Sequence, residues 1–171
     1  LIGGGFGGKE DIMGQIHAAL LAWKTKRPVK ILYDRHESLV VHPKRHATQI
    51  SVKIGAKRDG TIMAAQTELY GDTGAYASLG DKVMTRATTH STGPYEIPHV
   101  KIDCYAMYTN NPPAGAFRGF GVYQSAFAVE SAMDELAELL GVHPVDIRMK
   151  NALHVGSITN TGQLLRDSVG L

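Results

Sequence analysis

The stretch ATQISVKIGAKRDGTIMAAQTELYGD, residues 47–72, carries the pattern from which the central strands are predicted. Ile and Val alternate with polar or small residues between positions 50 and 54, and the turn sequence KRDGT (57–61) is followed by a second run rich in apolar residues. Alternation with a period of two around an Asp-Gly turn is typical of an antiparallel hairpin. We therefore expect paired strands at 47–56 and 62–72.

The rest of the chain places helices and further strands around this hairpin. These elements are predicted from apolar residues at a period of 3.6 or 2, and from Gly and Pro at their ends. We predict helices at 9–25, 80–90 and 124–140, a short helix from Pro144, and strands at 29–34 and 99–109. The predicted fold class is α+β, a mixed sheet with an antiparallel hairpin and flanking helices.

The composition of the chain indicates which kinds of binding partner are not expected. The 171 residues carry 18 Lys and Arg against 16 Asp and Glu, and the two signs are interspersed. Neither nucleic acid nor a membrane surface is therefore an expected partner. No apolar run approaches the roughly 18 residues of a membrane span. The single Cys104 excludes a disulfide within the chain and suits a reducing, cytoplasmic compartment.

A glycine-rich stretch near the start, GGGFGGKE at 3–10, allows more than one interpretation. Three of its glycines fit the G-x-G-x-x-G pattern of a dinucleotide-binding domain, with Asp34 at the distance of a ribose-binding carboxylate. The hairpin at 47–72 counts against this alternative, which needs a further strand-helix-strand unit. A phosphate loop also fits poorly, because Glu10 stands where that motif needs Ser or Thr.

A second glycine stretch, GAFRGFG at 115–121, repeats the design of the first. Each stretch has a Phe between glycines, and the two stretches carry charges of opposite sign at Glu10 in the first and Arg118 in the second. Glycine lets backbone N–H groups approach a bulky, oxygen-rich ligand closely. The pair predicts one ligand site built from both stretches, whereas each stretch alone could be a tight turn.

The two stretches resemble the molybdenum-binding large subunit of the xanthine dehydrogenase and aldehyde oxidase family. The likeness extends to VMTRATTH at 83–90 and DIRMKN at 146–151. It implies that residues 1–152 are the first part of a molybdopterin-binding domain, and that 153–171 are a loop or frayed end leading to a downstream domain. It also implies an enzyme that hydroxylates an electron-poor carbon with oxygen derived from water.

The resemblance assigns roles to individual residues. Those expected to bind molybdenum-molybdopterin, in its mono- or dinucleotide form, are Gly5, Phe6, Gly7, Arg118 and Gly119. No protein ligand to the metal is expected, because the dithiolene of the pterin holds it. Glu10 and Arg86 match catalytic, substrate-binding residues of xanthine-type members, and Phe120 matches the ring on which a flat substrate stacks. This trio implies a planar N-heteroaromatic substrate such as a purine.

Other parts of the enzyme are expected outside these residues. The glutamate that acts as general base corresponds to a position beyond Leu171, and iron–sulfur clusters and FAD belong to other domains or subunits. The expected partners are therefore the remaining large-subunit domains and the iron–sulfur and flavin units. As an isolated fragment the chain is expected to be inactive, and the alternative from another class is a structural or interaction module without catalysis.

Overall fold

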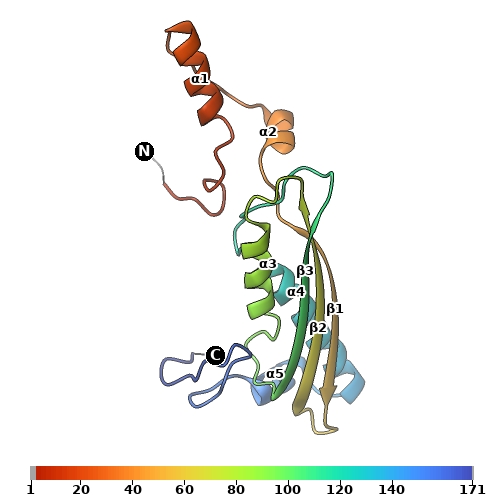
Figure 1. Cartoon of the computed structure of the whole chain (residues 1–171). Coiled ribbons are helices and arrows are strands. Elements are labelled where there is room, and N and C mark those ends of the chain that lie inside the picture. Colours follow the sequence, from red (N-terminus) through yellow and green to blue (C-terminus); the bar gives the residue numbers. More distant parts are fainter. Residues whose placement is uncertain (1–2, 171) are drawn as a thin grey trace.

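A three-stranded sheet in the order β1-β2-β3 forms the centre of the fold (Figure 1). The computed structural model describes residues 3–170. β1 (Ala47–Ala56) pairs antiparallel with β2 (Ile62–Gly74), which confirms the predicted hairpin. In the turn between them the Lys57 N–H donates to the Thr61 carbonyl, and the Thr61 N–H donates to Asp59 Oδ1.

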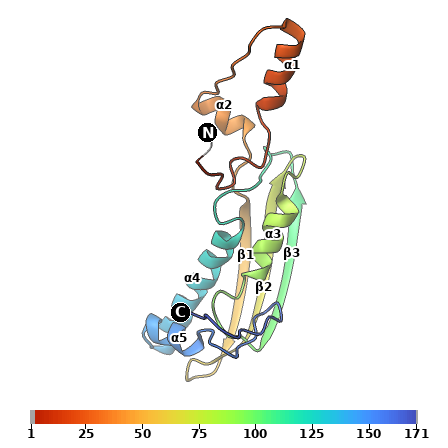
Figure 2. The ribbon, with the colours of Figure 1, turned by 90° about the vertical axis from the view of Figure 1, so that its left-hand side faces the viewer.

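The third strand, β3 (His99–Tyr108), runs parallel to β2, so the sheet is mixed as predicted. A parallel neighbour requires a crossover connection, and this connection contains α3 (Gly80–Thr89). α3 packs on β2 and β3, and α4 (Val122–Leu140) packs on β1. Both helices therefore lie over the sheet, and Figure 2 shows them in front of the strands.

The core lies between the sheet and these two helices. Leu69 of β2 is fully buried against Met84 and Ala87 of α3. A larger cluster joins the start of β2 to α4 and to α5 (Pro144–Asn151). Its buried members are Ile62, Ala65, Tyr95, Ile97, Val129, Met133, Ala137 and Ile147. Removal of this apolar surface from water is the main contribution to stability.

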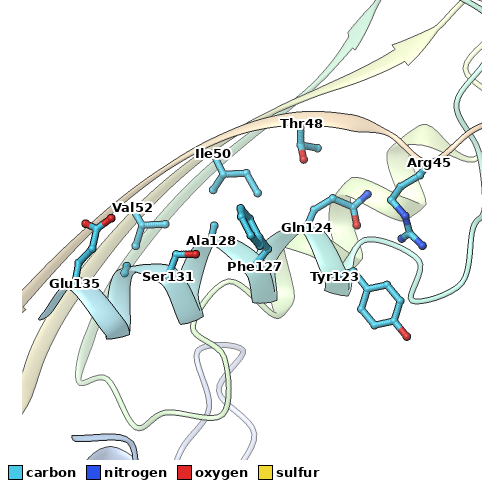
Figure 3. Close-up of a pocket in the computed structure, with 11 residues that line it drawn as sticks. Arg45, Thr48, Ile50, Val52, Tyr123, Gln124, Phe127, Ala128, Ser131 and Glu135 are labelled. Atoms are coloured by element: carbon cyan, nitrogen blue, oxygen red, sulfur yellow. The ribbon is translucent and has the colours of Figure 1, made fainter. Parts of the chain in front are cut away.

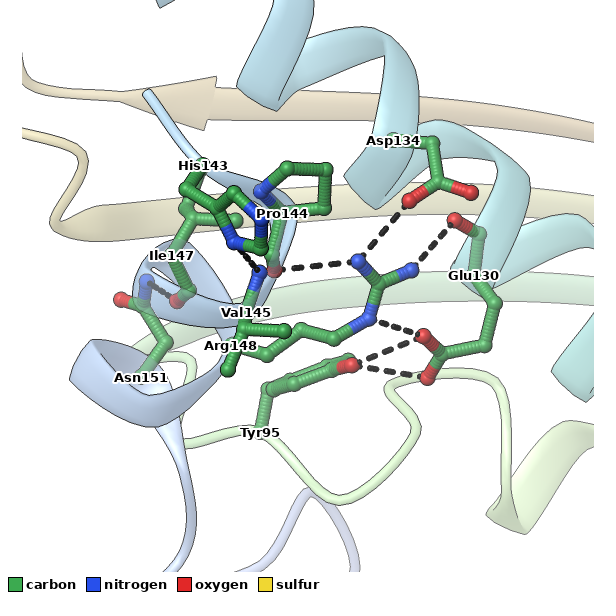
Figure 4. Close-up of polar contacts among 9 residues, drawn as sticks. All are labelled: Tyr95, Glu130, Asp134, His143, Pro144, Val145, Ile147, Arg148 and Asn151. Atoms are coloured by element: carbon green, nitrogen blue, oxygen red, sulfur yellow. Dashed lines mark hydrogen bonds and ion pairs between the residues drawn. The ribbon is translucent and has the colours of Figure 1, made fainter.

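An ion-pair network fixes α5 to α4 (Figure 4). Arg148 Nε donates to Glu130 at 2.7 Å, and Arg148 Nη1 pairs with Asp134 at 2.8 Å. The Tyr95 hydroxyl donates to the same Glu130 carboxylate. Burial and this carboxylate raise the pKa of Tyr95. The network joins the segment before β3 to both helices.

The N-terminal part of the chain, residues 3–41, stands apart from the sheet, and we call it the arm. Figures 1 and 2 show α1 (Gln15–Thr25) and α2 (Arg35–Val41) beyond the end of the strands, and neither helix has a buried residue. The helix predicted at 9–25 begins later than expected. Residues 9–14 form turns and bends instead, because Gly14 disfavours helix and the Met13 carbonyl accepts from the Tyr33 hydroxyl.

The strand predicted at 29–34 is wrong. Within residues 3–170 this segment pairs with no strand, and it leads into α2, which was not predicted. Asp34 caps α2: its carboxylate accepts from the Glu37 N–H at 2.8 Å, and the Glu37 carboxylate accepts from the Asp34 N–H at 2.9 Å. This capping box occupies the carboxylate that the dinucleotide alternative would need.

The other predicted elements are confirmed within about two residues at each end. α4 ends at Gly141, which adopts a left-handed conformation, and α5 begins at Pro144. Beyond Ala152 the chain forms turns and one short bridge between Ile158 and Leu164. No helix within residues 3–170 has the length and apolar character needed to cross a membrane.

Replacement of Asn151 tests the packing of α5. Its buried side chain accepts from the Ile62 N–H at 2.8 Å and donates to the Gly60 and Ile147 carbonyls. Asn151→Ala leaves buried backbone groups unpaired, so we expect a loss of about 3 kcal/mol in the free energy of unfolding. Urea denaturation measures it. The control Lys101→Ala removes an exposed ion pair with Asp103 and should cost less than about 1 kcal/mol.

Candidate functional site

The two glycine stretches are neighbours in space and line one cavity of about 430 Å³. Residues 5–8 of the first stretch and 116–118 of the second contribute to its walls, and Asp11, His42 and Pro43 complete the lining. The cavity therefore lies where the arm meets the rest of the chain. Its two main walls come from segments far apart in the sequence.

The approach of the two stretches is closest at Gly7, whose φ is +92°. A Cβ atom at this position would lie 2.6 Å from the carbonyl carbon and oxygen of Ala116 and 2.7 Å from Phe117 Cα. These are backbone atoms, which cannot rotate away as a flexible side chain can. The contact therefore requires glycine at position 7.

Phe6 and Arg118 bring an aromatic ring and a cation to the cavity. The Arg118 guanidinium lies 5.6 Å from the centroid of the Phe6 ring. Phe6 and Phe120 both adopt left-handed φ angles, 53° and 50°. This conformation costs a residue other than glycine about 1–2 kcal/mol. Such strain is concentrated at ligand sites, because the surrounding structure must hold it.

Free backbone donors lie beside this cation. Within residues 3–170 the N–H groups of Gly5, Phe6 and Gly7 have no hydrogen-bond acceptor, whereas the Gly8 N–H donates to the Gly5 carbonyl at 2.9 Å. Unpaired N–H groups on a glycine loop, next to a guanidinium, favour negatively charged oxygen atoms. The donor set therefore fits an oxygen-rich, anionic cofactor.

Arg45 holds the second glycine stretch from the side of β1. Its Nη2 donates to the Arg118 carbonyl at 2.8 Å, and its guanidinium lies 4.5 Å from the centroid of the Phe117 ring and 5.1 Å from that of Tyr123. The guanidinium thus contacts the middle of the second glycine stretch and the first turn of α4. Cation–π contacts of this kind add to the hydrogen bond.

Helix α3 contacts the C-terminal end of the second glycine stretch. A Cβ atom on Gly121, where φ is +100°, would lie 2.2 Å from the Val83 carbonyl oxygen. In the next turn, the Ser125 hydroxyl donates to the Ala87 carbonyl at 2.6 Å. The start of α4 is therefore seated directly on the backbone of α3.

No hydrogen bond, ion pair or stacking contact joins the three predicted substrate residues within the described part of the chain. Glu10 is exposed, and its carboxylate accepts from the adjacent Lys9 N–H at 3.1 Å. Arg86 is exposed on α3 and lines a different cavity, of about 360 Å³. Phe120 is half-buried in the second stretch. Their roles toward a substrate stay predictions.

Sequence reasoning missed four residues around the site, Asp11, His42, Pro43 and Arg45. Three of them belong to the segment HPKRH at 42–46, which passes beside the second glycine stretch. Four cationic or titratable side chains around a proline, His42, Lys44, Arg45 and His46, were the available signal. The sequence alone could not show that this segment runs beside residues 113–118.

A larger cavity, of about 550 Å³, lies between β1 and α4 (Figure 3). Ile50, Val52 and Phe127 give it apolar walls, and Glu135 lies at the end opposite Arg45. Arg45 therefore contacts the second glycine stretch and also borders this cavity. None of its lining residues was predicted from the sequence to bind a cofactor or substrate.

Below the site, His46 is buried near the start of α3 and shares a hydrogen bond of 3.1 Å with the Thr73 hydroxyl. Burial lowers the pKa of His46, although nearby Asp72 opposes this effect.

Within residues 3–170 no group of three or more His, Cys, Asp or Glu side chains is placed to hold a metal ion.

Comparison with known proteins identifies the class to which this fold and cavity belong. Residues 1–152 match the family model described as molybdopterin cofactor-binding domain. The chain belongs to this family. It is 53% identical over 169 residues to the nicotinate dehydrogenase large molybdopterin subunit of Eubacterium barkeri, a match that covers 99% of this chain and 40% of that protein.

Other relatives differ in the reaction that their names describe. A probable xanthine dehydrogenase subunit of Bacillus subtilis is 45% identical over 150 residues, which cover 88% of this chain and 20% of that protein. The solved structure of the aldehyde oxidoreductase from Desulfovibrio gigas matches 95% of this chain and 18% of its own, with a TM-score of 0.90 and 36% identity. The chain thus spans less than half the length of these relatives.

Replacement of two left-handed glycines by Ala distinguishes the cost of a steric clash in the free energy of unfolding from the cost of the backbone conformation alone. Gly121→Ala places a methyl group against the backbone of α3, whereas Gly141→Ala, at φ +66°, meets nothing within 4 Å. We expect Gly141→Ala to cost about 1–2 kcal/mol in the free energy of unfolding, and Gly121→Ala about 3 kcal/mol or more. Equal losses in urea denaturation would show that α3 does not restrain this loop.

We expect acidic pH to lower the free energy of unfolding through protonation of His46. Its pKa is lowered in the folded state, so below about pH 6.5 the unfolded chain binds a proton that the folded chain excludes. Stability should therefore fall as pH drops from about 6.5 toward the lowered pKa. His46→Asn should flatten this part of the pH profile of unfolding, and replacing the exposed His36 by Asn should leave it unchanged.

Proposed function

We propose that this chain forms part of the large subunit of a molybdenum hydroxylase, which oxidises an electron-poor carbon of a planar N-heteroaromatic ring with oxygen from water. The observation that carries this proposal is the cavity between residues 5–8 and 116–118, in a chain of the molybdopterin cofactor-binding family. The proposal extends to the whole protein, of which these residues are one part.

In this proposal the cavity holds the molybdenum cofactor. The free N–H groups of Gly5, Phe6 and Gly7 donate to its oxygen atoms, and Arg118 binds it from the second stretch. Within the described chain Gly119 does not line the cavity, and as the neighbour of Arg118 it is proposed to contact the cofactor through its backbone. When bound, the cofactor supplies the oxygen-transfer and two-electron redox chemistry. The chain supplies binding and orientation. The close packing of Gly7 on Ala116 fixes the distance between the two walls.

The substrate class is the finer part of the proposal. Glu10 would hydrogen-bond a ring nitrogen, Arg86 would stabilise negative charge that develops on the substrate, and Phe120 would stack on the ring. The relative at 53% identity is named for nicotinate, which is an N-heteroaromatic acid. A purine remains the other candidate, since a further relative is named for xanthine.

Exposed apolar side chains on the arm support the proposal that other domains contact this chain. Ile16, Leu20 and Trp23 of α1 are all more than half exposed. Apolar side chains gathered on one exposed helix favour burial by another surface. We propose that the remaining large-subunit domains cover them, and that electrons leave through iron–sulfur and flavin units in the cytoplasm. If the chain is instead an inactive interaction module, α1 would still be its contact surface.

Elemental analysis of the protein purified from its native host tests the proposal. Near-stoichiometric molybdenum, together with turnover of nicotinate or xanthine and slower turnover of an aromatic aldehyde, is expected. Molybdenum with faster aldehyde turnover would reject the substrate class and keep the cofactor. Absence of molybdenum would favour the inactive module.

Gly7→Ala should abolish cofactor binding. The added Cβ would lie 2.6 Å from backbone atoms of Ala116, so the two stretches must separate. We expect molybdenum content to fall at least about tenfold relative to the unaltered protein. Gly3→Ala is the matched control, because a Cβ there has no atom within 4 Å. Equal molybdenum content in both variants would contradict this placement of the cofactor.

Arg86→Met should affect catalysis without affecting cofactor content. Removal of one charge that stabilises a transition state costs about 100-fold or more in kcat/KM. Lys82→Met, one turn earlier on α3, removes an exposed side chain that within the described residues pairs with its neighbour Asp81 alone, and it should change kcat/KM less than about twofold. Steady-state kinetics with the N-heteroaromatic substrate measures both, and a normal rate in Arg86→Met would remove this residue from the site.

A further inference from the structure

The wall of the cavity that belongs to the arm is held to the rest of the chain by very few contacts. Residues 3–14 carry the first glycine stretch, and within the described chain they make one hydrogen bond to residues 42–170. In that bond the Ser78 hydroxyl donates to Asp11 Oδ1 at 2.8 Å. The other connection is packing of Gly7 and Phe6 against residues 116–118.

The Asp11 carboxylate lies between two elements of the site. A Cβ atom on Gly115 would lie 3.0 Å from Asp11 Oδ2 and 2.6 Å from Ser78 Oγ. Asp11 thus reaches the turn before α3 and the second glycine stretch together. Oδ2 is buried and has no hydrogen-bond partner among residues 3–170. Burial of a carboxylate oxygen without a hydrogen bond lowers the free energy of unfolding. The contact of Asp11 Oδ2 with Gly115 therefore does not stabilise the fold by itself.

The turn that presents Ser78 has an unusual backbone. Three consecutive residues other than glycine, Tyr76, Ala77 and Ser78, have φ angles of 64°, 64° and 40°. The Thr73 hydroxyl donates to the Ala77 carbonyl, and the Gly80 N–H donates to the same carbonyl at 2.7 Å. Strain persists only where the surrounding structure holds it. The constrained turn directs the Ser78 hydroxyl toward Asp11.

We propose that Asp11 is a positioning residue, which through Ser78 holds the first glycine stretch at its distance from the second. Asp11 acts through the backbone of residues 5–8 and does not itself react. Its effect on catalysis rests on the proposed function, whereas its effect on the loop does not. Misplacement of a catalytic group by about 1 Å can cost 100-fold in rate.

The test uses the full-length large subunit in its assembled enzyme, with the variants Asp11→Ala, Ser78→Ala, their combination, and Asp11→Asn. The amide oxygen of Asn can still accept from Ser78, so Asp11→Asn is the conservative rescue. Ser51→Ala, exposed on β1, is the control. Hydrogen exchange followed by mass spectrometry reports separately on peptides covering 3–14 and 47–72.

We expect exchange of the hydrogen-bonded amides in 3–14, among them the Gly8 N–H, to be at least about tenfold faster in both alanine variants, no faster in their combination than in either alone, and unchanged in Asp11→Asn. Exchange of 47–72 should not change. In the molybdenum-loaded enzyme kcat should fall by about 10- to 100-fold, with KM changed less than about threefold.

Two results would overturn the inference: unchanged exchange of 3–14, or equally faster exchange of 47–72, which would mean general destabilisation. A lack of molybdenum and turnover in the unaltered enzyme would reject the proposed function instead. The exchange measurement would still decide whether Asp11 holds the loop.

Discussion

The fold depends on the central position of β2. This strand pairs with β1 on one side and β3 on the other, so its register fixes both neighbours: Leu69 lies opposite Ile50 and also opposite Cys104. A shift by one residue would turn its buried side chains away from the helices. At Gly71 a Cβ would lie 2.3 Å from Met84 Sδ, so the Met84 side chain of α3 packs directly on the backbone of the strand. The place of α3 in turn sets the start of α4, and with it the second glycine stretch.

The two walls of the candidate site are therefore fixed to very different degrees. The second stretch is anchored to α3 through Gly121 and Ser125, and to the segment before β1 through Arg45. The first stretch belongs to the arm, whose helices bury no residue. The packing of Gly7 on Ala116 therefore sets the width of the cavity, and the firm second wall defines where the first stretch lies. A firm wall suits a site that must position a bound group to within about 0.5 Å.

Much of the fold could be predicted from the sequence, because its signals are local. The alternation in β1, the apolar-rich run of β2 after the Asp-Gly turn, and Gly141 after α4 were sufficient to predict these elements. The strand predicted at 29–34 failed because apolar residues in the arm do not face a core, and the capping pair Asp34 and Glu37 was overlooked. In the site, the pairing of the glycine stretches followed from their shared design. Asp11 and Arg45 could not be found, since their partners Ser78 and Arg118 are 67 and 73 residues away in the chain.

These long separations bear on the order in which the chain folds. The helices of the arm and the β1–β2 hairpin need only local contacts, which form within microseconds. The parallel pairing of β2 with β3 must first close a loop that contains α3, and such non-local contacts form more slowly. The second glycine stretch lies beyond β3 in the chain and is seated on α3. The cavity is consequently one of the last features to appear, and a cofactor meets a chain whose sheet has already formed.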